Sequence, residues 1–210
     1  MLNPLCELRK TSSEKGSFNE SSVEFDNGSV FRVVETLYES CDYIICDDLG
    51  NEWADHLVFR KDNKPEIYFI HSKYYKQSSN SASNMHDIVG QAMKNIGNMF
   101  FDAKMLKGKF AKFGENYNFG GVKTAIPRLR KGCLDMLIGD VDNLLKKYDV
   151  TRYCVLVCPF LSKKNIELEF YKILNGDKVG GHITQLMWIL SSYANMSRES
   201  NVVPIIHCLP

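Results

Sequence analysis

Three short strand-like segments joined by tight turns lie in the first half of the chain, and they constrain its fold more than any other feature. They cover residues 43–46, 53–59 and 67–75, and the turns between them are rich in Asp, Asn and Gly. Strands this close in sequence pair as antiparallel neighbours, because a parallel pair needs a long crossover connection. The third segment is apolar along most of its length, which favours a central position in a sheet. The sequence therefore predicts an antiparallel three-stranded meander.

Helical and strand-like segments alternate around this meander. An amphipathic helix is expected from Ser29, because its apolar residues recur on one stripe. A linker rich in Ser and Asn over 77–83 offers N-caps for the following helix. Further helices are expected over 84–100, 134–148 and 163–174 and from 181 onward, and further strands over 152–160 and 202–206. The core order is helix, three-strand meander, helix, strand, helix, strand, which predicts an α/β fold with a mixed sheet and helices on both faces.

The length of 210 residues suits a single domain. Residues 1–28 contain many Ser, Glu and Asn residues and are expected to form a flexible lead-in, so the domain would cover residues 29–210. Within it, residues 101–131 form a basic insert without a clear period, expected to be a loop or a short helix. Its eight basic side chains are Lys104, Lys107, Lys109, Lys112, Lys123, Arg128, Arg130 and Lys131. Contact with a nucleic-acid backbone and an ordinary solvated surface are both compatible with this charge.

Composition narrows the class of protein further. The chain is 44% hydrophobic and 24% charged, with a formal net charge of +1, which is typical of a globular protein and excludes coiled coil and wholesale disorder. No apolar run approaches the length of a membrane span, and the first residues lack the pattern of a signal peptide. The 7 cysteines lack zinc-site spacing and are expected to be reduced. These features predict a cytoplasmic protein without a membrane association.

Three polar residues near the ends of two neighbouring predicted strands are candidates for catalysis or metal binding. Asp55 lies at the start of the second predicted strand, and His71 and Lys73 lie near the end of the third. Side chains two apart on a strand share a face, so His71 and Lys73 point the same way. Because the two strands are antiparallel, Asp55 is expected opposite them. An acid, a metal-ligating imidazole and an amine would then converge on one sheet face.

This arrangement resembles the PD-(D/E)xK superfamily of metal-dependent nucleases, which has the restriction-endonuclease-like fold. The resemblance covers roughly residues 29–160 and includes the order of helix, meander, helix and strand. It implies that Asp55 is the metal-bridging acid, that Lys73 is the catalytic lysine, and that the backbone carbonyl of Ser72 is a further metal ligand. The sequence departs from the family motif where Ala54 replaces a proline and where His71 replaces the second acid.

The replacement by His71 leaves three interpretations open. The chain has lost activity, or His71 itself binds the metal, or another residue supplies the acid. Some restriction enzymes of this fold carry that acid on the helix after the third strand, where this chain has Asp87. Gln91, one helical turn later, resembles the helix glutamine of the RecB-like branch, and Glu35 on the first helix matches an accessory acid of many members.

The resemblance implies hydrolysis of DNA phosphodiesters with Mg²⁺ or Mn²⁺ as cofactor. Carboxylates would hold the ion, which polarises the phosphate and lowers the pKa of the attacking water, while Lys73 would stabilise the developing charge. Ligation by His71 would shift preference toward Mn²⁺. The setting implied is a bacterial restriction or anti-phage defence system with a helicase or sensor partner, and homo-oligomers are compatible with it. The competing hypothesis is an inactive module of the same fold that binds nucleic acid or a partner protein. A further possibility is an obligate subunit, active only with its partner.

Overall fold

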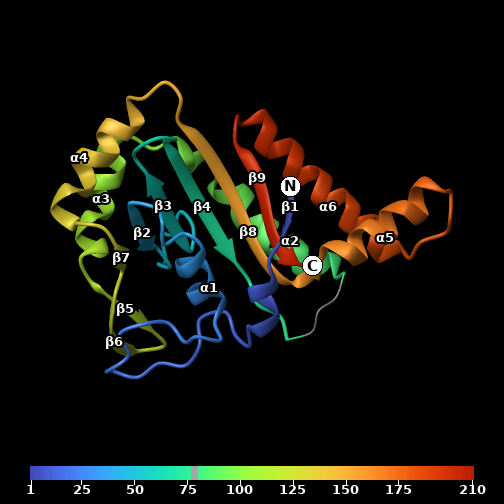
Figure 1. Ribbon diagram of the computed structural model, residues 1–210, viewed down its shortest axis with the longest axis horizontal. Helices are drawn as coiled ribbons and strands as arrows, with labels where there is room; N and C mark the ends of the chain where they lie inside the picture. Colours follow the sequence, from blue (N-terminus) through green and yellow to red (C-terminus); the bar gives the residue numbers. More distant parts are fainter. Residues whose placement is uncertain (77–79) are drawn as a thin grey trace.

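A mixed seven-stranded sheet forms the centre of the computed structural model, which describes residues 1–76 and 80–210 (Figure 1). The strand order is β1-β9-β8-β4-β3-β2-β7. Strands β2, β3 and β4 are an antiparallel meander, while β4, β8, β9 and β1 run parallel to one another. Their bounds are β1 Leu2–Pro4, β2 Tyr43–Cys46, β3 His56–Arg60, β4 Glu66–Ser72, β7 Leu129–Lys131, β8 Thr151–Ser162 and β9 Val203–Leu209.

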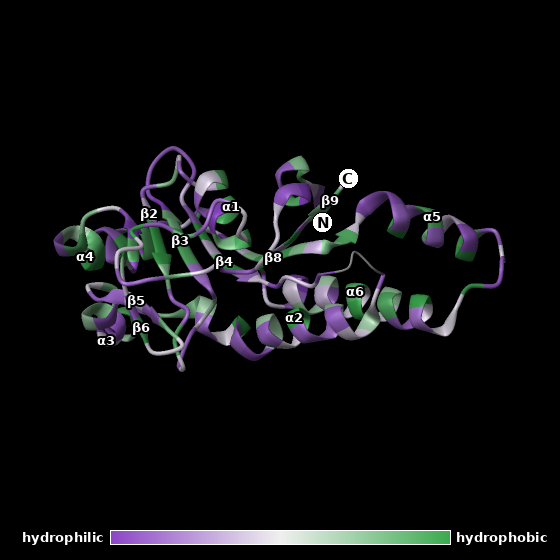
Figure 2. Cartoon of the chain, turned by 90° about the horizontal axis from the view of Figure 1, so that it is seen from below, coloured by the Kyte–Doolittle hydropathy of each residue, from purple (hydrophilic) through white to green (hydrophobic). Residues whose placement is uncertain are grey.

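Helices cover both faces of this sheet, as predicted. Helix α1 lies on one face, and α2 and α6 lie on the other (Figure 2). The α1 face is packed with Val30, Val34 and Ile70, and the α2 face with Met85, Phe69 and Leu186. The helices are α1 Val30–Leu37, α2 Ala82–Asn95, α3 Ala103–Phe113, α4 Leu134–Leu145, α5 Lys163–Leu174 and α6 Gly181–Glu199, with 3₁₀ turns η1 Cys6–Lys10 and η2 Ile96–Phe100.

The predicted meander and the parallel strand that follows it are confirmed. Ser29 caps α1 by accepting a hydrogen bond from the backbone of Arg32, which satisfies one of the free N–H groups at the helix start. The third strand ends at Ser72, so Lys73 lies just beyond the sheet rather than within it. The expected linker falls partly on residues 77–79, outside the described residues, and Ser81 is the N-cap of α2. Among residues 1–76 and 80–210, no helix combines the length and apolar character needed to cross a bilayer.

The prediction of a flexible N-terminal lead-in is wrong for the described structure. Residues 2–4 form strand β1, which pairs with β9 at the edge of the sheet. Leu8 and Phe25 are both buried, because each packs into one of the hydrophobic clusters. We call residues 11–29 the N-terminal strap. It runs along the lower edge of the domain in Figure 1 and is hydrogen-bonded to the start of α1.

The basic insert is folded, and it contains a helix, which is one of the two forms expected for it. It contains α3, the hairpin of β5 Asn116–Phe119 and β6 Val122–Pro127, and the edge strand β7. Asp102 caps α3 through a 2.7 Å hydrogen bond from the backbone of Met105. The buried positions of α3 are Leu106, Lys109 and Phe113. A lysine on the buried stripe interrupts the apolar period, which is why the sequence left a loop and a short helix as alternatives.

Candidate metal site and its surroundings

Three carboxylates meet at the end of the sheet where β4 terminates. They come from the acidic loop, residues 47–55, which joins β2 to β3. One ligand atom from each of Asp48, Glu52 and Asp55 lies within 4.8 Å of the others. Asp48 and Glu52 are half-buried and Asp55 is buried. Three oxygen donors at this spacing match what divalent cations such as Mg²⁺ and Mn²⁺ bind in proteins.

The acidic loop is held from within by its first residue. Asp47 is fully buried and accepts a 2.9 Å hydrogen bond from the backbone N–H of Trp53, across the loop. The ammonium of Lys109, on α3, lies 2.9 Å from Asp47 Oδ1 and donates a 2.8 Å bond to the carbonyl of Asn51. It also lies over the ring of Trp53. Lys109 therefore cross-links the loop and fixes where the loop directs its carboxylates.

Asp55 is the most deeply buried of the three acids. Its Oδ2 accepts a 2.7 Å hydrogen bond from the backbone N–H of Ser72, so the carboxylate is attached to the end of β4. Burial raises the pKa of Asp55 to about 8, opposed by the Ser72 hydrogen bond and reinforced by repulsion from Asp48 and Glu14. Burial and neighbouring negative charges favour cation binding by this carboxyl group, because a divalent ion replaces its proton and offsets the repulsion between the carboxylates.

Lys73 reaches this site from directly after β4. Its side chain is 25% exposed, and its ammonium lies 3.8 Å from Glu14 Oε2 in the N-terminal strap. Burial and then the charge of Asp48 raise the pKa of Glu52, and the charges of Lys15, Lys94 and Lys73, in falling order, oppose this shift. Lys73 therefore lies near the acidic loop, but within the described residues its ion pair is with Glu14 and not with Asp55. The strap thus adds an acid that the sequence did not suggest.

His71 lies beside this group on the α2 side of the sheet. The β3–β4 register pairs His56 with Ile70, so continuing it places Asp55 opposite His71. Burial, and then the charges of Lys73 and Lys94, lower the pKa of His71 to about 3. The imidazole is consequently neutral at physiological pH, as a metal ligand must be. Within the described residues, however, His71 is not part of the group of three acids.

Helix α2 contributes less than the resemblance implies. Gln91 is half-buried, and its Oε1 is buried without a hydrogen-bond partner in the described part of the chain. Lys94, three residues further on the same side of the helix, is close enough to act on Glu52 and His71. Asp87 is exposed, accepts a 2.8 Å hydrogen bond from Tyr75, and is not among the three clustered acids.

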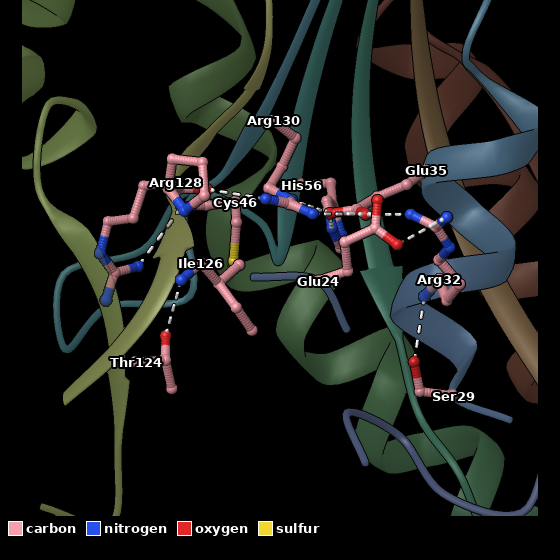
Figure 3. A network of polar contacts seen from close by, with 11 residues as sticks. Glu24, Ser29, Arg32, Glu35, Cys46, His56, Thr124, Ile126, Arg128 and Arg130 are labelled. Carbon is pink, nitrogen blue, oxygen red and sulfur yellow. Dashed lines mark hydrogen bonds and ion pairs between the residues drawn. The ribbon is translucent and has the colours of Figure 1, made fainter. Parts of the chain in front are cut away.

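Glu35 belongs to a separate ionic network on α1 (Figure 3). Its Oε1 accepts a 2.5 Å hydrogen bond from Arg130 and lies 3.8 Å from His56 Nε2, and Arg32 lies 3.8 Å from its Oε2. Burial alone would raise the pKa of Glu35, but the interactions with the neighbouring His56 imidazole and with Arg130 outweigh it and hold the pKa below its ordinary value. The expected accessory acid thus fixes β7 and α1 rather than joining the acidic cluster.

The predicted basic stripe is not a continuous surface. Three of its members are used inside the protein: Lys109 cross-links the acidic loop, Arg130 pairs with Glu35, and Arg128 is buried and donates to the carbonyls of Cys46 and Asp48. Lys131 donates to the carbonyl of Glu39. The remaining exposed lysines are Lys104, Lys107, Lys112 and Lys123, of which Lys112 pairs with Glu115.

Four residues of the site were not anticipated. Asp48 and Glu52 looked like turn residues, and Glu14 and Lys15 lie in the segment expected to be flexible. A signal for the first two was present, because Asp48, Glu52 and Asp55 are spaced closely enough for one loop to bring their carboxylates together. No local pattern marks Glu14 and Lys15, since the tertiary fold alone brings the strap to β4.

Comparisons with known proteins found no relative of this chain. No family model, curated protein or solved structure matches the chain.

Proposed function

We propose that this protein is a metal-dependent nuclease that hydrolyses phosphodiester bonds in DNA, with a restriction-endonuclease-like fold. The observation that carries the proposal is the convergence of three carboxylates within 4.8 Å of one another on the end of β4, where Lys73 follows. Clustered acids next to an amine suit a reaction in which negative charge grows on a phosphate. The order of α1, meander, α2 and the parallel strand β8 is compatible with that fold.

The residues present fit a divalent cation. All three clustered donors are carboxylate oxygens, which Mg²⁺ and Mn²⁺ prefer, and the buried Asp55 is raised in pKa partly by repulsion from Asp48. The unpartnered oxygens of Ser72 and Gln91 are further polar groups in the surrounding elements. A bound ion would supply the charge that polarises the phosphate and activates water. Asp48, Glu52 and Asp55 would hold it, and His71 is the neighbouring neutral nitrogen donor.

The protein's own groups have distinct roles in this proposal. Asp55 is anchored by the Ser72 N–H, so one of its oxygens keeps a fixed direction. Lys73, partly exposed, can contact a phosphate that enters from solvent and stabilise its added negative charge. Lys109 touches no substrate and acts as a positioning residue for the acidic loop.

A plasmid cleavage assay with Mn²⁺ and with Mg²⁺ tests the proposal. Wild-type protein should nick or linearise the plasmid, and Asp55→Asn and Lys73→Ala should each reduce the rate by a factor on the order of 10² or more. Lys164→Ala, which removes an exposed lysine on α5 outside the basic insert, is the matched control and should cleave normally. Cleavage that persists in Asp55→Asn would contradict the assignment.

The second candidate is an inactive module of the same fold, and His71 in place of an acid is the observation that favours it. Such a module would retain DNA or a partner protein without cutting. Calorimetry with Mn²⁺ separates the two candidates before any cleavage is measured, because a nuclease site must bind the ion and a module need not. If Mn²⁺ binds and no DNA is cut by the chain alone, adding candidate helicase or sensor partners tests whether it is an obligate subunit.

A further inference from the structure

The N-terminal strap places a second lysine directly on the acidic cluster. Lys15 Nζ lies 2.7 Å from Asp48 Oδ2, and this is the shortest contact that any ammonium makes with the three described carboxylates. The Lys15 side chain is 15% exposed and that of Asp48 16%, so the pair is largely screened from water. A charge-assisted contact of this length, partly out of water, is much stronger than an exposed surface pair.

The position of Lys15 is fixed by the backbone of the strap. The carbonyls of Ser13 and Glu14 accept 3.0 Å hydrogen bonds from Val30 and Phe31, two of the N–H groups that a helix start leaves free. The preceding residue, Glu14, accepts a 3.4 Å bond from the N–H of Tyr74. The strap is therefore tied both to α1 and to the chain that follows β4, and it holds Lys15 over the acidic loop.

The ammonium of Lys15 also has neighbours other than Asp48. It lies 4.9 Å from the ring centre of Phe119, which is 50% exposed, and 5.4 Å from that of Phe31. Ring faces attract cations, so the ammonium would keep a favourable environment if it left the carboxylate. Tyr117 donates a separate 2.7 Å hydrogen bond to Asp48 Oδ2, which would keep that carboxylate oriented without the lysine.

We propose that Lys15 and a divalent cation exchange at Asp48, and that the released ammonium binds the phosphate backbone of the nucleic acid substrate. The proposal rests on the proposed metal site and adds a residue to it. A divalent ion among the three acids carries twice the charge of Lys15 and repels it at short range, so the ion weakens the Lys15–Asp48 pair. Phosphate then becomes the counter-ion of the ammonium, in addition to Lys73.

This exchange predicts two effects of opposite sign for Lys15→Met, which removes the charge and keeps an apolar stem of similar length. Mn²⁺ binding should become about tenfold tighter, because the competing cation is gone. Binding of a DNA duplex in saturating Ca²⁺ should become about fivefold weaker, and its salt dependence shallower by about one ion. Lys15→Arg should stay close to wild type in both assays. A residue needed only for folding would weaken both.

Isothermal titration with Mn²⁺ and fluorescence anisotropy with a labelled duplex give the two affinities. Lys10→Met is the matched control, because it removes an exposed lysine just before the strap that pairs with none of the described acids, and it should leave Mn²⁺ affinity unchanged. Mn²⁺ binding to Lys15→Met that is unchanged or weaker would overturn the exchange, as would unaltered DNA binding. Absence of Mn²⁺ binding by the wild-type protein would instead overturn the proposed function, and the exchange with it.

Discussion

Replacing Asp55 with asparagine should make the protein more stable while it removes metal binding. Asp55 is buried, and its pKa is raised to about 8, first by burial and then by repulsion from Asp48 and Glu14. Its ionised form is therefore strained in the folded protein at neutral pH. Asn has nearly the same shape, and its amide oxygen can still accept the hydrogen bond from Ser72 N–H. The variant Asp55→Asn keeps the anchor and loses the charge.

The size of the effect follows from proton linkage. An unfolded aspartate has a pKa of ~3.9, so folded Asp55 holds its proton more tightly than the unfolded chain does. The stability that this proton contributes is complete below about pH 4 and is lost as pH rises toward about 8. The loss is about 1.4 kcal/mol per pH unit, or about 2.7 kcal/mol between pH 5 and pH 7. Local relaxation and water penetration soften buried charges, so we expect about half of this.

Thermal melts of both proteins at pH 5 and pH 7, without metal, measure this contribution. The comparison is needed because His71 and His207 have pKa values lowered to about 3 and about 4, in each case chiefly by burial. Unfolded histidines bind protons more readily, so these two residues make stability rise with pH up to about 6.5. Both proteins share that trend, and their difference isolates Asp55. The Tm advantage of Asp55→Asn should grow by about 3–5 °C between the two pH values.

An advantage that is absent, or that shrinks from pH 5 to pH 7, would refute this reasoning, because it would show that folded Asp55 ionises like an ordinary aspartate. Saturating Mn²⁺ provides an independent check in the same instrument. It should raise the Tm of the wild-type protein by binding the folded state and should leave that of Asp55→Asn nearly unchanged.

Three further substitutions separate the loop clamp, the α1 network and the second-acid position. Lys109→Met leaves Asp47 buried without its ion-pair partner, so it should lower the free energy of unfolding in urea by about 3–5 kcal/mol and weaken Mn²⁺ binding in calorimetry. Lys107→Met, at an exposed position on the same helix, should change neither quantity. Glu35→Gln weakens the ion pair with Arg130 and should lower the free energy of unfolding by about 2 kcal/mol without altering Mn²⁺ affinity. A large change in Mn²⁺ affinity would show that Glu35 belongs to the metal site. His71→Glu supplies an acid opposite Asp55 and should raise the ratio of Mg²⁺- to Mn²⁺-supported plasmid cleavage, and an unchanged ratio would count against His71 facing the ion.

The parts of the fold that the sequence predicts well are those with strong local periods. The meander was evident because β2, β3 and β4 are short, apolar and separated by turns rich in Asp, Asn and Gly. The parallel strand β8 was evident from its continuous apolar run, because both of its faces are covered by helices. The strand pairing predicts that Asp55 and Lys73 lie near facing strand ends, and in the structure Asp55 lies in the loop before β3 and Lys73 just after β4.

The N-terminal strap could not be predicted, because its order depends on distant partners. Its composition is polar and resembles that of mobile segments, yet Phe25 is buried against Phe31 and Tyr117. Strand β1 has only three residues, and its pairing with β9 joins the two ends of the chain. Neither feature has a local signature. The number of basic residues in the insert likewise overestimates its exposed positive charge, because the sequence does not show that Lys109, Arg128 and Arg130 point inward.

The acids of the site come from one loop, whereas its lysines come from three distant elements, so only the proximity of the acids can be predicted from the sequence. The three carboxylates come from one loop of a hairpin, so their proximity is local and survives wherever that hairpin forms. The ammonium groups of Lys15, Lys73 and Lys94 come from the strap, the end of β4 and helix α2, and only the complete fold brings them to the acids. Without those lysines the loop would concentrate negative charge in a half-buried position, which is costly. Cation binding at this site should therefore depend on tertiary structure. A variant that detaches the strap but keeps the hairpin intact should change metal affinity while the secondary structure of the sheet is unchanged.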